Sequence, residues 1–377
     1  MKKNSFLLFA LLSCACFVGL TACREARQGR VEYRYPEFPQ EYSMQPTVIS
    51  DSVFIPAMIY DMEVVGDYLL LVYLGENQWL HVYDKTTGQH LKSAFFRGRG
   101  PSEIQGMVTR LSLDAKRENI SLFDNRAEQL LTISVDSLMH GAFRPTTVVS
   151  DHFARADEVY PLAGDTLVFR LQLPADEDAS RYFRFANDRV SARYFEYPVD
   201  DKELAFRLYG DYRLTISPDQ TKMAVGTLLG AILECFDLSE GIAPVSRSYI
   251  REPFLNEERN LDVNASGLGF VDLYGTNDRL YTVFNGTGTM DFNNLTLFDW
   301  DGNPLSLHST PYNLSKICVE PDQSVLYAVA VDPEKGNFLV SFPLQGQAKE
   351  QGNAPIQRFT PKSNQQETRH ETSFNLF

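Results

Sequence analysis

The sequence predicts an all-β protein, a six-bladed β-propeller built of four-stranded antiparallel blades. Three observations lead to this prediction. Short apolar runs alternate with turns of Gly, Asp, Asn and Pro, helical periodicity is nearly absent, and two sequence elements recur about every 51 residues. The chain has 377 residues and 44% hydrophobic content, which is enough for a large core.

Residues 1–22 have the pattern of a secretory signal peptide. Two lysines at positions 2 and 3 precede an apolar run over residues 6–20, which is too short for a stop-transfer segment. The sequence Leu20-Thr21-Ala22-Cys23 places a small residue directly before a cysteine, and this resembles the lipobox of bacterial lipoproteins. The resemblance implies cleavage after Ala22 and acylation of Cys23. An ordinary signal peptide followed by a chance cysteine is the alternative.

Beyond this signal, composition divides the chain into three parts. Residues 23–50 are expected to form the lipid anchor and a polar tether, because residues 24–50 are polar and contain three prolines. The propeller is expected over residues 51–345, and a polar C-terminal tail over residues 346–377. Removal of residues 1–22 leaves 33 basic and 49 acidic side chains, a net charge of −16, which makes nucleic acid an unsuitable partner.

The first recurring element is a turn with an aspartate just before an apolar strand. Asp and Gly suit such turns because they tolerate left-handed or side-chain-bonded backbone. The six copies are Gly66-Asp67, Leu113-Asp114, Gly164-Asp165, Pro218-Asp219, Asn277-Asp278 and Pro321-Asp322.

The second recurring element is an apolar strand that ends near an aromatic residue, often followed by Asp. Two such elements per period fit one four-stranded sheet per repeat, and six repeats fit a closed ring with no unpaired sheet edges. Chance recurrence of common dipeptides is the alternative. The six copies are Val82-Tyr83-Asp84, Leu122-Phe123-Asp124, Phe185-Ala186-Asn187, Cys235-Phe236-Asp237, Leu297-Phe298-Asp299 and Val340-Ser341-Phe342.

Three features together resemble the six-bladed, TolB-like propeller lipoproteins common in Bacteroidetes. They are the lipobox at Cys23, the two Pro-Asp-Gln turns, and the segment 97–103, Arg-Gly-Arg-Gly-Pro-Ser-Glu, which looks like the G-R-G-P-G-E segment of that group with Ser102 in a glycine position. The resemblance covers residues 50–345 and implies a fold and an address in the cell envelope, but no reaction. A single glutamate, Glu25, follows the cysteine where surface-exported relatives carry an acidic cluster. We therefore expect an outer-membrane anchor that faces the periplasm.

The candidate binding residues are Arg97, Arg99, Glu103 and Asn285, all expected on the channel face. Loop 97–103 is expected to join the outer strand of blade one to the inner strand of blade two, beside the central channel. Arg99 would offer a bidentate fork to a carboxylate, a phosphate or a sugar acid. The alternative is structural, with Arg99 paired to Glu103 between the blades. Asn285 opens a Gly-rich polar loop that lacks the lysine and helix of a phosphate loop.

No residue is assigned a catalytic or metal-binding role. The chain contains no Gly-x-Ser-x-Gly elbow, no His-Glu-x-x-His and no Cys/His cluster with zinc spacing. The favoured function is therefore binding: an anchored propeller that holds a protein, peptide or glycan at its channel face. The alternative is a metal-dependent hydrolase resembling six-bladed lactonases and esterases, with a divalent ion such as Ca²⁺ held by Glu103, Asn285 and nearby acids.

The two cysteines of the predicted propeller are expected to be free thiols. Cys235 is placed on the third strand of blade four and Cys318 on the first strand of blade six. A whole blade lies between them, whereas a disulfide needs Cα atoms within about 7 Å.

Lipidation at Cys23 is testable directly. Mass spectrometry of the native protein should find residues 1–22 absent and Cys23 acylated, and Cys23→Ala should release the protein from membranes. An unmodified N-terminus at another residue would contradict the lipobox interpretation.

Overall fold

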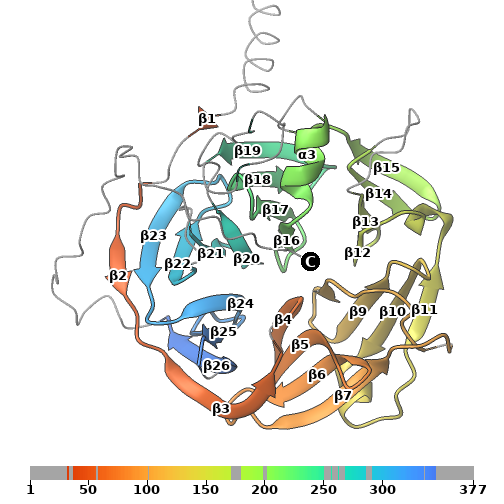
Figure 1. The fold of residues 1–377 in the computed structure, drawn as a ribbon. Coiled ribbons are helices and arrows are strands. Elements are labelled where there is room, and N and C mark those ends of the chain that lie inside the picture. Colours follow the sequence, from red (N-terminus) through yellow and green to blue (C-terminus); the bar gives the residue numbers. More distant parts are fainter. Residues whose placement is uncertain are drawn as a thin grey trace, which may run out of the picture.

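The computed structural model describes residues 32–33, 37–56, 58–100, 102–170, 180–197, 202–249, 256, 262, 268–285, 291–334 and 336–344. In these residues six antiparallel sheets stand around a central channel (Figure 1), which confirms the predicted fold class. The expected signal peptide, Cys23 and tail 346–377 lie outside the described residues. Among the described residues, no helix is long and apolar enough to cross a membrane.

The first three blades follow one another along the chain, each with its strands in sequence order. Blade one contains β4 (Asp61–Val65), β5 (Tyr68–Gly75), β6 (Gln78–Asp84) and β7 (His90–Phe96). Blade two contains β8 (Leu111–Leu113), β9 (Asn119–Asp124), β10 (Gln129–Ser134) and β11 (Thr146–Val149). Blade three contains β12 (Glu158–Pro161), β13 (Thr166–Phe169), β14 (Tyr182–Ala186) and β15 (Arg189–Tyr194).

The last three blades each add a strand from the N-terminal part of the chain. Blade four contains β16 (Tyr212–Ile216), β17 (Lys222–Thr227), β18 (Ile232–Asp237), β19 (Ala243–Tyr249) and β1 (Glu32–Tyr33). Blade five contains β20 (Phe270–Gly275), β21 (Leu280–Phe284), β22 (Asn294–Phe298), β23 (Pro304–Ser309) and β2 (Glu41–Ser43). Blade six contains β24 (Asn313–Val319), β25 (Val325–Asp332), β26 (Gly336–Pro343) and β3 (Thr47–Ile55).

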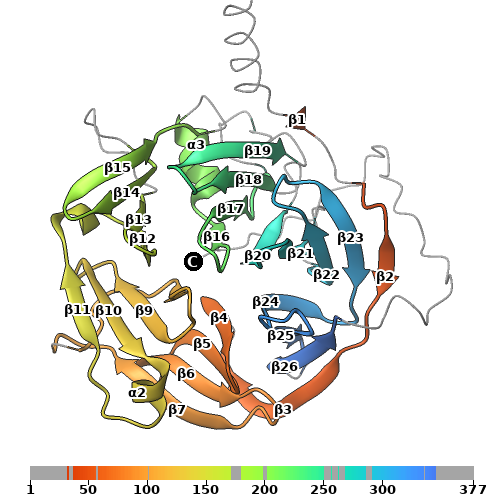
Figure 2. The same ribbon diagram turned by 180° about the vertical axis from the view of Figure 1, so that it is seen from behind.

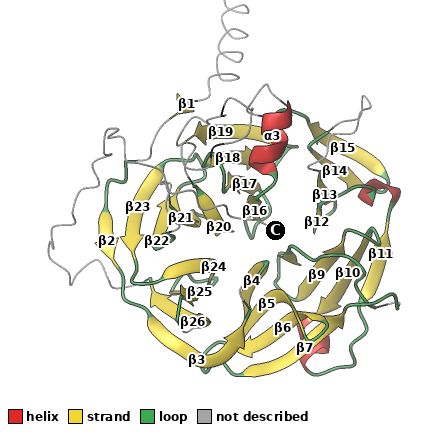
Figure 3. Ribbon diagram, viewed as in Figure 1, coloured by secondary structure: helices red, strands yellow, loops and turns green. Residues whose placement is uncertain are grey.

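In the part of the chain that the structure describes, helices occur only in short connections between strands (Figure 3). The helix α2 (Val135–Met139) lies between β10 and β11, the 3-10 helix η1 (Asp151–Phe153) follows β11, and α3 (Lys202–Tyr209) precedes β16. Apolar clusters fill the space between neighbouring blades.

All six predicted aspartate turns join the first and second strands of a blade. They therefore lie together on one face of the ring, the hairpin face, and the connections between successive blades lie on the opposite face, the loop face. In blade two the second recurring element falls on β9, the second strand, instead of a later one. Asp124 ends this strand early because its carboxylate accepts the backbone N–H groups of Arg126 and Ala127, both at 3.1 Å, and so caps the next turn.

An N-terminal belt, formed by residues 32–33 and 37–55, runs along the outer edges of blades four, five and six (Figures 1 and 2). The strands β1 and β2 pair in parallel with β19 and β23, and β3 pairs antiparallel with β26. These described residues were expected in a free tether ending at residue 50. They belong to the propeller instead, because outer strands present unpaired N–H and C=O groups that a passing chain can satisfy.

The strand β3 closes the ring. Blade six takes only three strands from its own part of the chain, and β3 supplies the fourth. Ile55, at the end of β3, is 3% exposed and joins the apolar cluster of blade six. Closure was expected from the sequence, but its source in residues before 51 was not.

The predictions for the two cysteines are confirmed. Cys235 lies in β18, the third strand of blade four, and Cys318 lies in β24, the first strand of blade six. Both are free and buried. Burial raises the pKa of Cys235 to about 12, so this thiol is inert at neutral pH.

The belt contacts blade five through an aromatic stack. The ring of Tyr42, in β2, lies over the ring of His308, in β23, with centroids 5.0 Å apart. Burial lowers the pKa of His308 to about 4, so the imidazole is neutral in the folded protein at neutral pH.

Acidification should therefore weaken the folded state through His308. The pKa is depressed relative to the unfolded chain, so this contribution to stability is present above pH 6.5 and is lost as the pH falls towards 4. The loss at pH 5 should be about 2 kcal/mol. His308→Phe should show a correspondingly smaller loss between pH 7 and pH 5 in denaturant unfolding. Identical pH slopes in the variant and the wild type would contradict this assignment.

Candidate functional site

Each blade contributes one charged side chain near the start of its innermost strand, and the sign of the charge alternates around the channel. Arg110 directly precedes β8, and the other five residues lie within the innermost strands. An even number of blades lets this alternation close without two like charges side by side. In blade order the residues of this charge ring are Asp61, Arg110, Glu158, Arg213, Asp272 and Lys316.

Asp61 joins blade one to blade two. Its carboxylate accepts Arg110 Nη1 at 3.1 Å and the backbone N–H of Leu111 at 2.8 Å. The guanidinium of Arg110 also lies 3.7 Å, through Nε, from the carboxylate of Glu158 in blade three. Burial raises the pKa of Asp61 and of Glu158, and the charge of Arg110 opposes both shifts. Arg110 thus links three consecutive blades.

The same arrangement recurs between blades five and six. Asp272 accepts Lys316 Nζ at 3.0 Å and the backbone N–H of Ile317 at 2.8 Å. Burial lowers the pKa of Lys316 to about 8, so the ammonium remains charged at neutral pH. The two side chains are nearly inaccessible, at 4% and 3% exposed. The positive charge of Lys316 also lowers the pKa of Asp61, which couples blade six back to blade one.

Between blades four and five the contact is to the backbone. Arg213 Nε donates to the carbonyl of Val271 at 2.6 Å, and its Nη1 donates to the carboxylate of Asp211 at 2.6 Å. Direct contacts of ring residues thus join blades one to two, two to three, four to five and five to six.

A second layer lies two residues further along the innermost strands, towards the hairpin face. Glu63 accepts Arg117 Nη2 and the hydroxyl of Tyr274, each at 3.0 Å. Burial raises the pKa of Tyr274 well above its usual value, so this hydroxyl keeps its proton and donates. Tyr274 comes from blade five and Glu63 from blade one, so the pair spans the channel wall in front of blade six.

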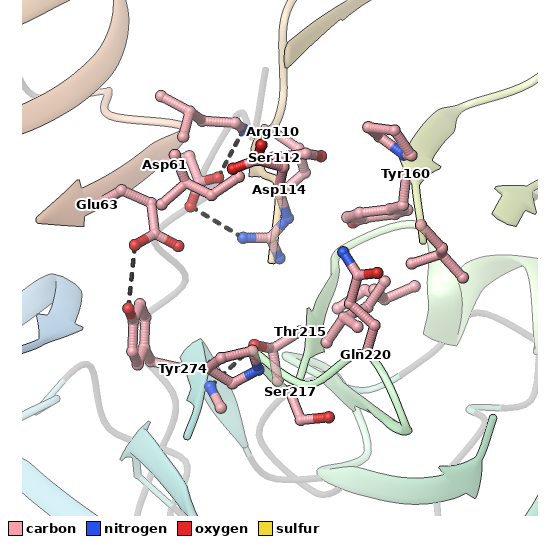
Figure 4. Close-up of a pocket in the computed structure, with 18 of the residues that line it drawn as sticks. Asp61, Glu63, Arg110, Ser112, Asp114, Tyr160, Thr215, Ser217, Gln220 and Tyr274 are labelled. Carbon is pink, nitrogen blue, oxygen red and sulfur yellow. Dashed lines mark hydrogen bonds and ion pairs between the residues drawn. The ribbon is translucent and has the colours of Figure 1, made fainter. Parts of the chain in front are cut away.

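A cavity of about 90 Å³ occupies the channel between these layers and the hairpins (Figure 4). Arg110 points into it from the ring, and Ser112, Thr215 and Ser217 are among the residues that line it. Gln220, from the hairpin after β16, and the ring of Tyr160 form its opposite wall. The lining is thus rich in hydrogen-bonding groups, which suits a small polar ligand or the end of a larger one.

The lining combines acidic and basic side chains. Among the described residues that line the cavity there is no histidine or cysteine, and the described part of the chain holds no group of three His, Cys, Asp or Glu side chains placed to bind a metal ion. The cavity acids Asp61 and Glu63 are each paired with an arginine. The polar and charged groups of the lining can donate hydrogen bonds to a ligand and accept them from it.

The structure places Arg97, Arg99 and Glu103 in the connection between blades one and two, on the loop face and away from this cavity. Arg97 and Arg99 are exposed. Glu103 Oε2 accepts the backbone N–H of Gly100 at 2.7 Å, and a Cβ at Gly98 would lie 1.9 Å from the same oxygen. The carboxylate of Glu103 therefore lies inside the loop. A side chain at position 98 or 100 would collide with it, so glycine stands at both positions. No ion pair joins Arg99 to Glu103 within the described residues, so binding by Arg99 stays a prediction.

Asn285 lies apart from these three residues, at the end of β21 in blade five. It is 3% exposed, and its Nδ2 donates to the carbonyl of Asp291 at 2.7 Å. It fastens the two ends of a loop whose middle, residues 286–290, lies outside the described residues. Asn285 and Glu103 thus hold backbone in different blades, and the ligand set suggested for a divalent ion is not assembled by the described residues.

The charge ring was not anticipated from the sequence, although a signal for it exists. Each ring residue is followed by an apolar residue, a variable one and a third residue that is mostly apolar, as in Arg110-Leu-Ser-Leu and Lys316-Ile-Cys-Val. The pattern precedes the aspartate turn in every repeat. A charged residue inside an otherwise buried strand is the observation that would have found it.

Comparisons with known proteins agree with the fold and go no further. No protein-family model and no curated protein sequence matches the chain. A putative exported protein from Bacteroides fragilis is similar in structure, with 12% identity, a TM-score of 0.51, and coverage of 82% of this chain and 98% of that one. The class that fold and site define is a closed six-bladed propeller with a charged channel.

Two further solved structures have lower scores. A calcium-binding regucalcin from Agrobacterium tumefaciens has 11% identity and a TM-score of 0.49, with coverage of 81% and 95%. A gluconolactonase from Xanthomonas campestris has 14% identity and a TM-score of 0.48, with coverage of 78% and 88%. At this level neither likeness carries an argument about function.

Tyr274→Phe tests the link across the channel wall. It removes one of the two side-chain donors to the buried carboxylate of Glu63, so the free energy of unfolding should fall by about 1–3 kcal/mol. Tyr68→Phe, at a partly exposed tyrosine in the second strand of blade one, should change it by less than about 0.5 kcal/mol. Denaturant unfolding of both variants checks this. Equal effects would show that the Tyr274 hydroxyl contributes nothing specific.

Proposed function

We propose that this protein is a lipid-anchored binding protein of the cell envelope, and that its propeller takes a polar ligand into the channel cavity from the hairpin face. The observation that carries the proposal is a polar cavity in which Asp61 and Glu63 are each paired with an arginine, with Ser112 and Gln220 among the other lining residues. Such a lining recognises hydroxyl-rich or amide-rich groups. A glycan end or a peptide end is the ligand class that fits.

The metal-dependent hydrolase is the weaker alternative. A divalent ion in the channel would need carboxylates free to coordinate it. Here Asp61, Glu63 and Asp272 already hold Arg110, Arg117 and Lys316 at 3.0–3.1 Å. Displacing a buried cation would leave that cation without a partner, which costs about 3–5 kcal/mol for each pair.

The anchor part of the proposal rests on the lipobox at Cys23. Cys23 and the first belt residue, Glu32, are separated by eight residues, a span of at most about 30 Å. With lipid on Cys23, the outer edge of blade four would be held close to the outer membrane, on its periplasmic side. The propeller would then be a short-tethered receptor.

Filling the cavity tests the binding function. The soluble chain from residue 24 is screened by thermal shift against neutral and acidic oligosaccharides and short peptides. At least one class should raise the melting temperature of the wild type, and Ser112→Phe should abolish the shift because its ring occupies the cavity. Ser191→Phe, at an exposed site on β15, should retain it.

Two results would contradict this function. One is a ligand shift that Ser112→Phe leaves intact, which would place binding elsewhere. The other is a large shift with Ca²⁺ alone, lost on chelation and accompanied by lactone or ester hydrolysis, which would favour the hydrolase.

A further inference from the structure

A basic surface lies on the loop face, on the side of the ring away from the cavity. Three neighbouring connections form it, residues 97–107, 124–129 and 150–156, around the junctions of blades one, two and three. They carry four exposed arginines, although the chain as a whole has a net charge of −14. The four are Arg97, Arg99, Arg126 and Arg155.

The first two connections are tied together by a buried carboxylate. Asp124 is fully buried and accepts the backbone N–H groups of Gln105 at 2.6 Å and Gly106 at 2.9 Å. The backbone at Gly106 lies so close to Arg126 that a Cβ at Gly106 would be 2.8 Å from the Cβ of Arg126. Arg126 therefore stands directly beside the loop that carries Arg97 and Arg99.

The third connection is tied to the second in the same way. Glu128 Oε1 accepts the backbone N–H of Arg155 at 3.1 Å. The three connections thus form one continuous surface with a fixed backbone, which lowers the entropy cost of binding a partner.

Most acidic side chains of these connections point inwards, and this makes the exposed surface positively charged. Glu103, Asp124 and Glu128 each accept backbone N–H groups within the surface, and Asp151 is the exposed acid that remains. Because these carboxylates bond the backbone, the four arginines outnumber the exposed acids, which are Asp151 and, in the adjoining turn that bonds Arg97, Glu76.

Two large apolar side chains lie within the same surface. Phe96 is 48% exposed and Met107 is 42% exposed. Phe95 has φ +58°, a conformation that a bulky residue rarely adopts, and its fully buried ring packs against Phe143 with centroids 5.0 Å apart. This backbone turn sends Phe95 into the core and leaves Phe96 outside. Strain of this kind persists where the surroundings enforce it, and it is concentrated at functional positions.

We propose that this basic surface docks an acidic segment of a partner protein that also carries an apolar side chain. Arginine forks match carboxylates, and Arg, Phe and Met are the residue types enriched in protein interfaces. The contrast with the acidic remainder of the chain would steer an acidic partner to this face and away from the others. The inference goes beyond the proposed ligand binding, because the surface and the cavity lie on different faces of the ring.

Peptide selection tests the proposal without knowledge of the partner. A random peptide library is selected on the immobilised soluble chain from residue 24, and the winning peptides are measured by fluorescence anisotropy. Enriched peptides should combine Asp or Glu with an aromatic or aliphatic residue. Arg99→Glu, Arg126→Glu and Phe96→Ser should each weaken their binding at least tenfold. Lys116→Glu, at an exposed lysine in the aspartate turn of blade two on the hairpin face, should change it less than twofold.

Three outcomes would overturn the proposal: no enrichment, enrichment of neutral or basic peptides, or equal losses in Lys116→Glu and Arg99→Glu. Ser112→Phe should leave peptide binding at this surface unchanged. The thermal-shift test of the cavity and the peptide test of the basic surface can therefore fail independently of each other.

Discussion

The rest of the structure depends on the ring of alternating charges in the channel. A propeller packs its blades through apolar surfaces, but its innermost strands converge where there is little room for side chains from six directions. Charged groups of alternating sign occupy that space. Arg110 pairs with both Asp61 and Glu158, and Asp272 pairs with Lys316. A buried charge without its partner is costly, so these pairs define which blade lies beside which.

Two other structural features complete the ring of blades. Carboxylates that accept backbone N–H groups, such as Asp124 and Glu103, fix the connections between blades. The N-terminal belt then supplies the missing strand of blade six and covers two further sheet edges. In both the carboxylate contacts and the belt pairing, hydrogen bonds of polar groups fix the position of the backbone. The cavity on one face of the ring and the exposed arginines on the other are the two places where we propose binding.

The fold was predictable because its signals are local and repeated. Each blade carries its own aspartate turn, such as Gly66-Asp67, and the period alone indicates six sheets. The belt was missed because Glu41-Tyr42-Ser43 shows no apolar alternation, and its pairing with β23 is made by backbone groups that any sequence has. The candidate site was missed for another reason. Asp61 and Arg110 stand 49 positions apart, so their pairing becomes visible only once neighbouring blades are aligned in space.

The free energy of unfolding of Lys316→Met tests the role of the charge ring most directly. Methionine keeps the length of the side chain and removes the charge, so Asp272 would remain buried without its cation. The account predicts a loss of about 3–5 kcal/mol, against less than about 0.5 kcal/mol for Lys116→Met at an exposed site. A loss at Lys316 no larger than the loss at Lys116 would contradict the claim that alternating charges hold the blades together.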